Sequence, residues 1–555
     1  MNKKVCSFPI LFALLALLIG TCAVVFPASA QAAPTSTGSI TVSGTVASSY
    51  DAYQIFSANV VDGDSDAKTF TDLVWASDAV RDAALPVLHS AGMPNSQTTA
   101  QKAAEWLNTD SHLTGALSAQ LARSLQSSGA VSVALNAGTA AKLPSGYWLI
   151  VADDDAIAQG EVGTAPIMAL VGGGAVTVKP KAATPKVSKH VLEDSTAAWQ
   201  KAADATVADD LYWRLSATVP AGLTAYDTYA VRFVDTMGAG LDPSKVAASM
   251  RVYVAAGADG GFDAVSADKD GRVGTEPAKG WTDITAQCAT KIAADGTFTV
   301  RTGDLIAALG GADAFTAGAR VVAVYNAPLN SACNHGIAKG NPNEAYLCYP
   351  RSPFADQSGD AGFTRTPSDD ACAYTWDLAL TKRSSDGDKP LAGAVLSIAD
   401  DRGRTLAADG TWDADGKATV TTGEDGRVTV SGVDSGKLEV CELKAPKGYT
   451  AFEGTRCVTV KAESLDVDQV AAAKPKLTIT AESPLRADSA DGSTGSLEAS
   501  LINTPTGTPP SITTGGFMPS TGDMAMYAAA AAAVAGAALI VVALLVKRGG
   551  GSHKE

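Results

Sequence analysis

The segment Tyr374-Thr375-Trp376-Asp377-Leu378-Ala379-Leu380-Thr381-Lys382 decides the fold of the region around it. In a β-strand, successive side chains point to opposite faces, so residues two apart share a face. One face of this strand would carry Trp376, Leu378 and Leu380, and it would end on Lys382. The segment therefore predicts a strand of a β-sandwich whose core face includes a lysine.

Two later strands of the same region also end their apolar face on a polar residue. The face ends on Glu442 in KLEVCE (437–442) and on Asn503 in SLEASLIN (496–503). A buried salt bridge next to an amide is one interpretation. The alternative is a covalent crosslink, because burial lowers the pKa of a lysine and raises that of a carboxyl. Neutral Lys382 could then attack the side-chain carbonyl of Asn503, with protonated Glu442 polarising it and ammonia leaving.

Strand patterns between residues 183 and 370 predict a second Ig-like β-sandwich with a similar set. Lys189 shares the phase of the neighbouring valines in VSKHV, and Asp235 shares the phase of Phe233. Asn326 and Asn330 both share the phase of the valines in RVVAVY, so the pattern leaves either amide open as the partner of Lys189.

Residues 34–182 have a mixed pattern. Alternation in SITVSGTV, YDAYQIF, SVALNAG, GYWLIVAD and IMALV indicates strands, and the Ala-rich section 99–128 indicates at least one helix. No metal-binding or nucleophile pattern occurs there. The region ends in VKPK (178–181), where a strand gives way to prolines. The chain is thus predicted to be mainly β, with tandem Ig-like β-sandwich domains at 183–370 and 372–505 after a mixed α/β domain.

Both ends of the chain are predicted to serve export. Residues 1–30 combine two early lysines, an apolar stretch and the small residues Ala28-Ser29-Ala30, which is typical of a signal peptide. Near the other end, residues 506–522 are rich in Gly, Thr and Pro and contain Met518-Pro519-Ser520-Thr521-Gly522. Residues 523–555 then hold an uncharged apolar run long enough to span a bilayer, followed by Lys547 and Arg548.

Composition disfavours several classes of function. The net charge of −15 argues against nucleic acid as a partner. The chain has only five histidines and no HExxH motif, and no Ser/His/Asp or Cys/His pattern indicates an enzyme. DGDSDA, DKDGRVGTE and WDADGK lack the spaced ligands of a calcium loop and are interpreted as hairpin turns. We therefore expect neither a metal nor another cofactor.

Six cysteines remain once the signal peptide is removed. An even number in an exported chain indicates disulfides. Cys441 and Cys457 lie on neighbouring predicted strands and are the expected pair. The other four allow three pairings, which the sequence does not separate: Cys288, Cys333, Cys348 and Cys372.

Several of these motifs resemble those of known families. Met518-Pro519-Ser520-Thr521-Gly522, the apolar run and the basic pair together resemble the cell-wall sorting signal of Gram-positive surface proteins. That resemblance implies that a sortase cleaves after Thr521 and transfers its carbonyl to an amine. VKPK resembles the pilin motif of sortase-assembled pili, which implies that Lys181 supplies the amine.

The sandwich domains carry further resemblances. The segment from Glu442 to Tyr449 is similar to a pilin E-box, and together with LTKRSSDG and LINTP it resembles a Cna-B-type domain. KHV at Lys189, FVDTMGAGL at Asp235 and APLN at Asn330 resemble the isopeptide-forming fimbrial domain. This last resemblance, and not the strand phase, selects Asn330 over Asn326.

Nearly the whole mature chain thus resembles the major backbone (shaft) pilins of sortase-assembled Gram-positive pili. The resemblance implies a structural subunit without enzymatic turnover, joined to identical subunits through Thr521 and Lys181 in a pilus anchored to the cell wall. The implied partners are a pilin-specific sortase, peptidoglycan, accessory pilins and host glycans or matrix proteins. The alternative is an accessory or tip adhesin that does not use Lys181.

Overall fold

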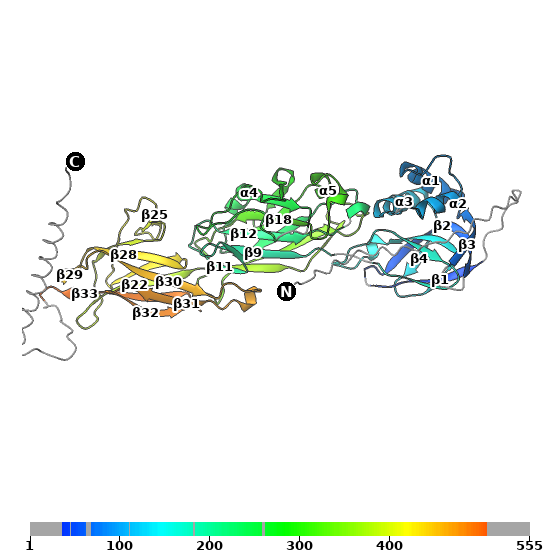
Figure 1. Ribbon diagram of the computed structural model, residues 1–555. Helices are drawn as coiled ribbons and strands as arrows, with labels where there is room; N and C mark the ends of the chain where they lie inside the picture. The colour runs from blue at the N-terminus through cyan, green and yellow to red at the C-terminus, as the bar shows by residue number, and fades with distance from the viewer. Residues whose placement is uncertain are drawn as a thin grey trace, which may run out of the picture.

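The computed structural model describes residues 36–44, 46–62, 68–109, 112–180, 184–221, 223–257 and 261–507. The chain is mainly β, as predicted, and its elements form three consecutive parts arranged in a row (Figure 1). Within these ranges no helix is long and apolar enough to cross a membrane. The predicted signal peptide at 1–30 and the predicted membrane helix within 523–555 lie outside the described residues.

The first part contains two sheets and three helices. The smaller sheet has the order β5-β1-β8, and the larger has the order β3-β2-β6-β7 with β4 also paired to β2. The strands are β1 (Thr37–Val42), β2 (Ser49–Asp62), β3 (Lys68–Trp75), β4 (Ser132–Asn136), β5 (Ala141–Pro144), β6 (Gly146–Ala152), β7 (Ile167–Val171) and β8 (Ala175–Val178). Alternate residues of β2 and β6 face the helices on one side and the smaller sheet on the other, so a separate apolar core forms on each side of the larger sheet.

The helices of the first part are α1 (Asp78–Ser90), α2 (Ala100–Leu107) and α3 (Gly115–Ser128). The Ala-rich section predicted to hold at least one helix therefore holds a pair of them. The side chains of Thr99 and Thr114 each accept a backbone N–H of the first helical turn, which starts a new helix at each position. Ser77 does the same for α1, which lies before the Ala-rich section.

The second part is a sandwich of two sheets around one large core. One sheet has the order β10-β9-β12-β18-β14-β15, and the other has β11-β21-β19-β13-β17-β16 with β20 paired to β19. The strands of the first sheet are β9 (Val187–Glu193), β10 (Ala198–Gln200), β12 (Tyr212–Thr218), β14 (Arg251–Ala255), β15 (Thr282–Asp283) and β18 (Arg320–Asn326). Those of the second are β11 (Ala202–Asp204), β13 (Arg232–Met237), β16 (Ala289–Ile292), β17 (Thr297–Arg301), β19 (Asn341–Pro350), β20 (Phe363–Arg365) and β21 (Asp369–Tyr374). Two single-turn helices, α4 (Val246–Ser249) and α5 (Leu305–Ala308), lie in its connections.

The third part is a second sandwich with its own core. One sheet has the order β27-β22-β33-β29 with β32 paired to β33, and the other has β25-β24-β23-β28-β30-β31 with β26 paired to β23. The strands of the first sheet are β22 (Trp376–Ser384), β27 (Arg427–Val433), β29 (Tyr449–Thr450), β32 (Leu485–Asp491) and β33 (Ser496–Pro505). Those of the second are β23 (Val395–Ala399), β24 (Thr405–Leu406), β25 (Trp412–Asp413), β26 (Val420–Thr421), β28 (Gly436–Lys444), β30 (Thr455–Glu463) and β31 (Lys476–Ala481).

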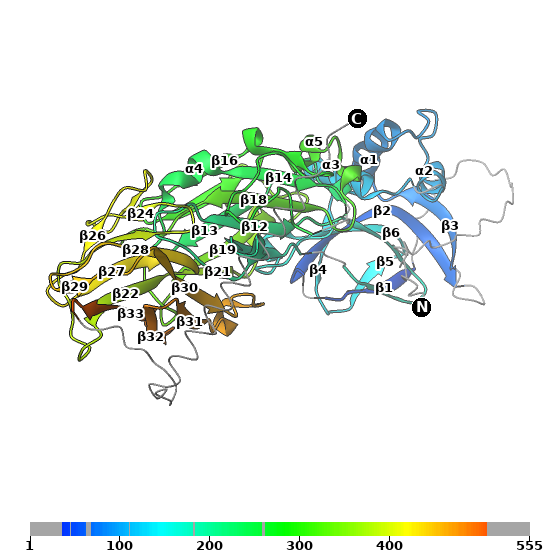
Figure 2. The same ribbon diagram turned by 60° about the vertical axis from the view of Figure 1, so that its left-hand side comes forward.

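The second and third parts are joined by almost continuous strand. β21 pairs within the second part as far as Tyr374, and β22 of the third part begins at Trp376. The sheet of the second part therefore extends past residue 370, where the sequence pattern placed its end. Figure 2 shows the same pair of sandwiches from a second direction, with the third part turned toward the viewer and overlapping the second.

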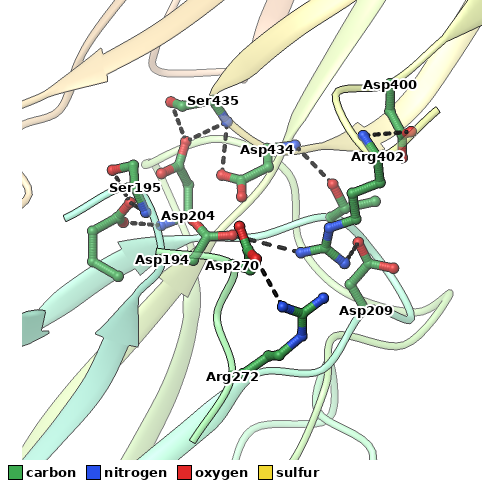
Figure 3. A network of polar contacts seen from close by, with 12 residues as sticks. Asp194, Ser195, Asp204, Asp209, Asp270, Arg272, Asp400, Arg402, Asp434 and Ser435 are labelled. Carbon is green, nitrogen blue, oxygen red and sulfur yellow. Dashed lines mark hydrogen bonds and ion pairs between the residues drawn. The ribbon is translucent and has the colours of Figure 1, made fainter. Parts of the chain in front are cut away.

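A network of charged and polar side chains connects the two sandwiches (Figure 3). Arg404 donates to Asp209 from Nη1 at 2.6 Å and from Nη2 at 2.8 Å. Asp204 Oδ2 accepts from the backbone N–H of Ser435 at 2.9 Å and from the indole of Trp376 at 2.6 Å. These hydrogen bonds and ion pairs therefore link the second part directly to the third. Among the residues that the structure describes, no group of three or more His, Cys, Asp or Glu side chains could hold a metal ion.

Candidate functional site

The third part brings Lys382, Glu442 and Asn503 together in its core. All three side chains are buried. Lys382 Nζ lies 3.2 Å from Glu442 Oε1, and Asn503 Nδ2 donates to that same oxygen at 2.9 Å. The carboxyl group therefore contacts both the amine and the amide that the sequence pattern suggested would react.

Strand order explains this convergence. β22 and β33 are adjacent and parallel, with Lys382 opposite Leu501 and Asn503 two residues further along the same face. Glu442 comes from β28 in the facing sheet, where its second oxygen accepts the backbone N–H of Phe452 at 3.1 Å. The first and last strands of the sandwich thus present the amine and the amide side by side.

The electrostatic environment favours a reactive amine. Burial lowers the pKa of Lys382 to about 8, although the neighbouring Glu442 opposes this shift. Lys382 Nζ and Asn503 Oδ1 are both buried without a hydrogen-bond partner. A buried amine whose only partner is an ion pair without a good hydrogen bond costs free energy, and an amide bond between the two side chains would remove that cost.

The second part holds a comparable site. Lys189 on β9 and Asp235 on β13 are fully buried and form an ion pair between the facing sheets. Burial lowers the pKa of Lys189 and raises that of Asp235, in each case against the attraction of the opposite charge. Both directions favour passing the proton from the lysine to the carboxyl.

The prediction that Asn330, or else Asn326, is the amide of this site is wrong. Asn326 donates to Asp210 at 2.7 Å and accepts the backbone N–H of Leu211, and Asn330 donates to backbone carbonyls of residues 239 and 241. The face of β18 that carries Val322 packs in a small cluster outside the sandwich core. A residue in phase with Val322 therefore points away from Lys189.

Asn343 on β19 is the amide that the structure places there. It is fully buried, and its Nδ2 donates at 2.9 Å to the hydroxyl of Tyr325, which also accepts from Lys189 Nζ at 2.8 Å. Its Oδ1 is buried without a hydrogen-bond partner. A signal was available in the sequence, because Asn343 shares the phase of Ala345 and Leu347, which are both in the core.

The backbone of Lys189 is held by a second ion pair that the sequence analysis did not identify. Asp369 accepts the backbone N–H of Lys189 at 2.7 Å and also pairs with Lys201. Lys201 in turn donates to the carbonyl of Lys189 at 2.8 Å. These bonds fix the strand segment from which the amine projects.

The remaining predicted residues lie elsewhere. Lys181 and the sorting motif, including Thr521, lie outside the described residues, whereas the neighbouring Lys179 is exposed directly after β8.

The expected disulfide is absent: Cys441 and Cys457 are free thiols. They are on paired strands, as predicted, but Cys441 is opposite Thr455, so the two cysteines are diagonal neighbours two residues out of register.

Comparisons with known proteins agree with the fold of the third part. Residues 377–474 match the family model described as SpaA, a prealbumin-like fold domain. A trypsin-resistant surface T6 protein of Streptococcus pyogenes serotype M6 is 31% identical over 143 residues, which cover 24% of this chain and 24% of that protein. The chain thus matches about a quarter of the length of this curated relative.

Solved structures of pilins are also similar to this chain. The T6 backbone pilin of Streptococcus pyogenes is 17% identical with a TM-score of 0.44, covering 86% of this chain and 100% of that one. The major pilin SpaD of Corynebacterium diphtheriae is 16% identical with a TM-score of 0.39, covering 85% and 97%. The major pilin BcpA of Bacillus cereus is 11% identical with a TM-score of 0.37, covering 85% and 99%. TM-scores below 0.5 do not establish a common arrangement of whole chains.

Proposed function

We propose that this chain is the structural shaft subunit of a covalent surface pilus. The observation that carries the proposal is the presence of two buried Lys–carboxylate–Asn sets, one in each sandwich. The row of three parts gives an elongated subunit that can transmit tension from one end to the other (Figure 1). The similarity of the third part to SpaA-type domains supports the same function.

Each set would form one internal crosslink. In the third part, Lys382 passes a proton to Glu442, and its free amine attacks the Asn503 carbonyl carbon, so that an N–C bond forms and the π electrons move to oxygen. The carboxyl group relays a proton from the attacking nitrogen to the amide nitrogen. The carbonyl then reforms as ammonia leaves. Lys189 and Asn343, with Asp235 as the acid, would react likewise in the second part.

Subunits would be joined by a different reaction. A pilin-specific sortase cleaves after Thr521 and holds the new carbonyl as a thioester, and the amine of Lys181 in the next subunit takes it. Lys179, two residues before Lys181, is exposed, and Pro180 is half-buried. The cell wall is the proposed final anchor, and accessory pilins and host glycans or matrix proteins are the proposed further partners.

Replacement of the acceptor lysine tests this function. We expect Lys181→Ala to abolish the high-mass ladder on an anti-pilin blot of wall extracts, because the sortase-bound carbonyl loses its nucleophile. Lys179→Ala, a matched loss of a lysine two residues away, should leave the ladder intact. A single band from the wild-type chain would favour an accessory or tip adhesin instead.

Removal of the donor tests the other half of the reaction. A chain truncated before Met518 loses both the carbonyl donor and the predicted anchor. We therefore expect monomer in the medium and no ladder. Polymer formed by this truncated chain would contradict the assignment of Thr521.

A further inference from the structure

The hydroxyl group of Tyr325 contacts all three reacting side chains of the second part. Tyr325 lies on β18 and is fully buried. Its oxygen is 2.8 Å from Lys189 Nζ, 2.8 Å from Asp235 Oδ2 and 2.9 Å from Asn343 Nδ2. The amine, the acid and the amide therefore meet at one oxygen atom.

The number of hydrogen bonds that a hydroxyl group can donate and accept determines its role in each of these contacts. A phenol has one hydrogen to donate and two lone pairs that accept. The hydrogen goes to Asp235 Oδ2, and the lone pairs accept from Lys189 Nζ and Asn343 Nδ2. Each capacity is filled, so the hydroxyl has a defined orientation between the acid and the nitrogen that must leave.

The third part shows why this hydroxyl is needed. There Glu442 itself accepts from the amide nitrogen of Asn503 at 2.9 Å. Aspartate is shorter by one methylene, and the hydrogen bonds found among the described residues include none between Asp235 and Asn343. Tyr325 occupies the position between them.

We propose that Tyr325 is a catalytic residue of the Lys189–Asn343 crosslink and carries a proton between Asp235 and the leaving amide nitrogen. This role rests on the proposed function above. Lys189 first passes a proton to Asp235 and then attacks, after which the hydroxyl accepts from protonated Asp235 instead of donating to it. The phenol gives its own proton to Asn343 Nδ2 and takes the one from Asp235, so the tyrosine is regenerated. Asp235 regains a proton from the Lys189 nitrogen as the C–N bond to ammonia breaks, so the only products are the amide and ammonia.

The surroundings of Tyr325 suit a relay better than a free phenolate. Burial, together with the charge of Asp235, raises the pKa of Tyr325 well above its ordinary value. A relay that passes one proton while receiving another leaves the oxygen neutral, so the high pKa is no obstacle. The ring also packs edge-on against Phe298 with centroids 4.8 Å apart, which holds the hydroxyl in place.

Removing the hydroxyl while keeping the ring tests the proposal. Residues 31–521 are isolated unfolded and refolded, and the loss of ammonia is followed by mass spectrometry with peptide mapping of both crosslinks. We expect Tyr325→Phe to slow the Lys189–Asn343 bond by about 100-fold or more. The Lys382–Asn503 bond in the same molecule, which uses no tyrosine, should form at the wild-type rate.

Tyr253→Phe is the matched control. Tyr253 on β14 is also fully buried in the second part, and its hydroxyl donates to the carbonyl of Thr275 at 3.0 Å, away from the reacting groups. It should crosslink like the wild type. Asn343→Ala lacks the crosslink but keeps the phenol, and Tyr325→Phe should have the same melting temperature as this variant. A clearly lower melting temperature of Tyr325→Phe would mean that the substitution disturbs packing, and it would overturn the catalytic role.

The remaining outcomes separate this role from the proposed function. If the wild-type chain forms the Lys189–Asn343 bond and Tyr325→Phe forms it equally fast, the role of Tyr325 is overturned while the crosslink stands. A wild-type chain that never forms this bond would overturn the crosslink itself, and the role with it.

Discussion

Two substitutions in the third part separate the contribution of the crosslink from that of the ion pair. Asn503→Ala removes the electrophile but keeps Lys382 beside Glu442. Glu442→Ala removes the acid, so that the bond does not form and Lys382 stays buried without a counter-charge. Each variant should fall short of its own sequence mass by one ammonia fewer than the wild-type chain does, but the two variants should differ in stability.

The expected magnitudes follow from the loop and from burial. A Lys382–Asn503 bond closes a loop of about 120 residues, which on the chain-entropy model constrains the unfolded chain by about 5 kcal/mol. For a domain of this size, that loss lowers Tm by roughly 15–20 °C in Asn503→Ala. Glu442→Ala should lose about 3–5 kcal/mol more, the usual cost of stranding one member of a buried ion pair.

Intact mass and calorimetry of residues 31–521 provide the assay. The wild-type chain should fall short of its sequence mass by two ammonias, measured after reduction of any disulfides, and each variant by one. The thermal transition of the third part should fall in the order wild type, Asn503→Ala, Glu442→Ala. An unmodified mass in the wild-type chain would refute the crosslinks, and equal stability of the two variants would refute the cost assigned to the stranded lysine.

Three further predictions concern the second part, the pH dependence and a buried carboxyl group. Asp235→Ala and Asn343→Ala should each restore the second ammonia, whereas Asn330→Ala should not, and mapping of the crosslinked peptide checks which amide reacts. Because the pKa of Lys382 is about 8 and its proton has to pass to Glu442, the reacting pair needs one proton, so the crosslinking rate on refolding should fall roughly tenfold per pH unit above 8; a rate that keeps rising above pH 8 would contradict the role of Glu442 as the acid. Burial raises the pKa of Glu193, which accepts the backbone N–H of Asp204, to about 8, so its contribution to stability is complete below its ordinary pKa and is lost as pH rises from there through 8. Glu193→Gln should flatten that loss in unfolding curves measured across this range.

The position of the crosslinks has a mechanical consequence. In the third part the bond would join β22, where the chain enters, to β33, the last strand described before residue 507. Tension applied at the two ends of that sandwich would then pass through a covalent amide and would not have to be borne by the hydrogen bonds between strands. Asn503→Ala should therefore unfold under a lower stretching force than the wild-type chain.

The sequence alone determined which face of each strand is buried. Period-2 alternation depends only on the local geometry of the backbone, so it identified Lys382, Glu442 and Asn503 as inward-facing residues before any strand pairing was known. The same signal identified Lys189 and Asp235. Burying a charged residue requires a partner, which made a polar set in each core predictable as well.

Only the tertiary structure decided which inward-facing residues meet. Asn326 belongs to the other face of β18 and Asn330 lies beyond the end of that strand, while Asn343 reaches the site because β19 lies beside β13. Cys441 and Cys457 lie on paired strands, yet register leaves them diagonal. Alternation along a strand fixes orientation with respect to that strand's own axis, whereas neighbours and register depend on the packing of residues far apart in the sequence. For that reason the amide partner of Lys189 and the hydroxyl of Tyr325 emerge only in the folded chain.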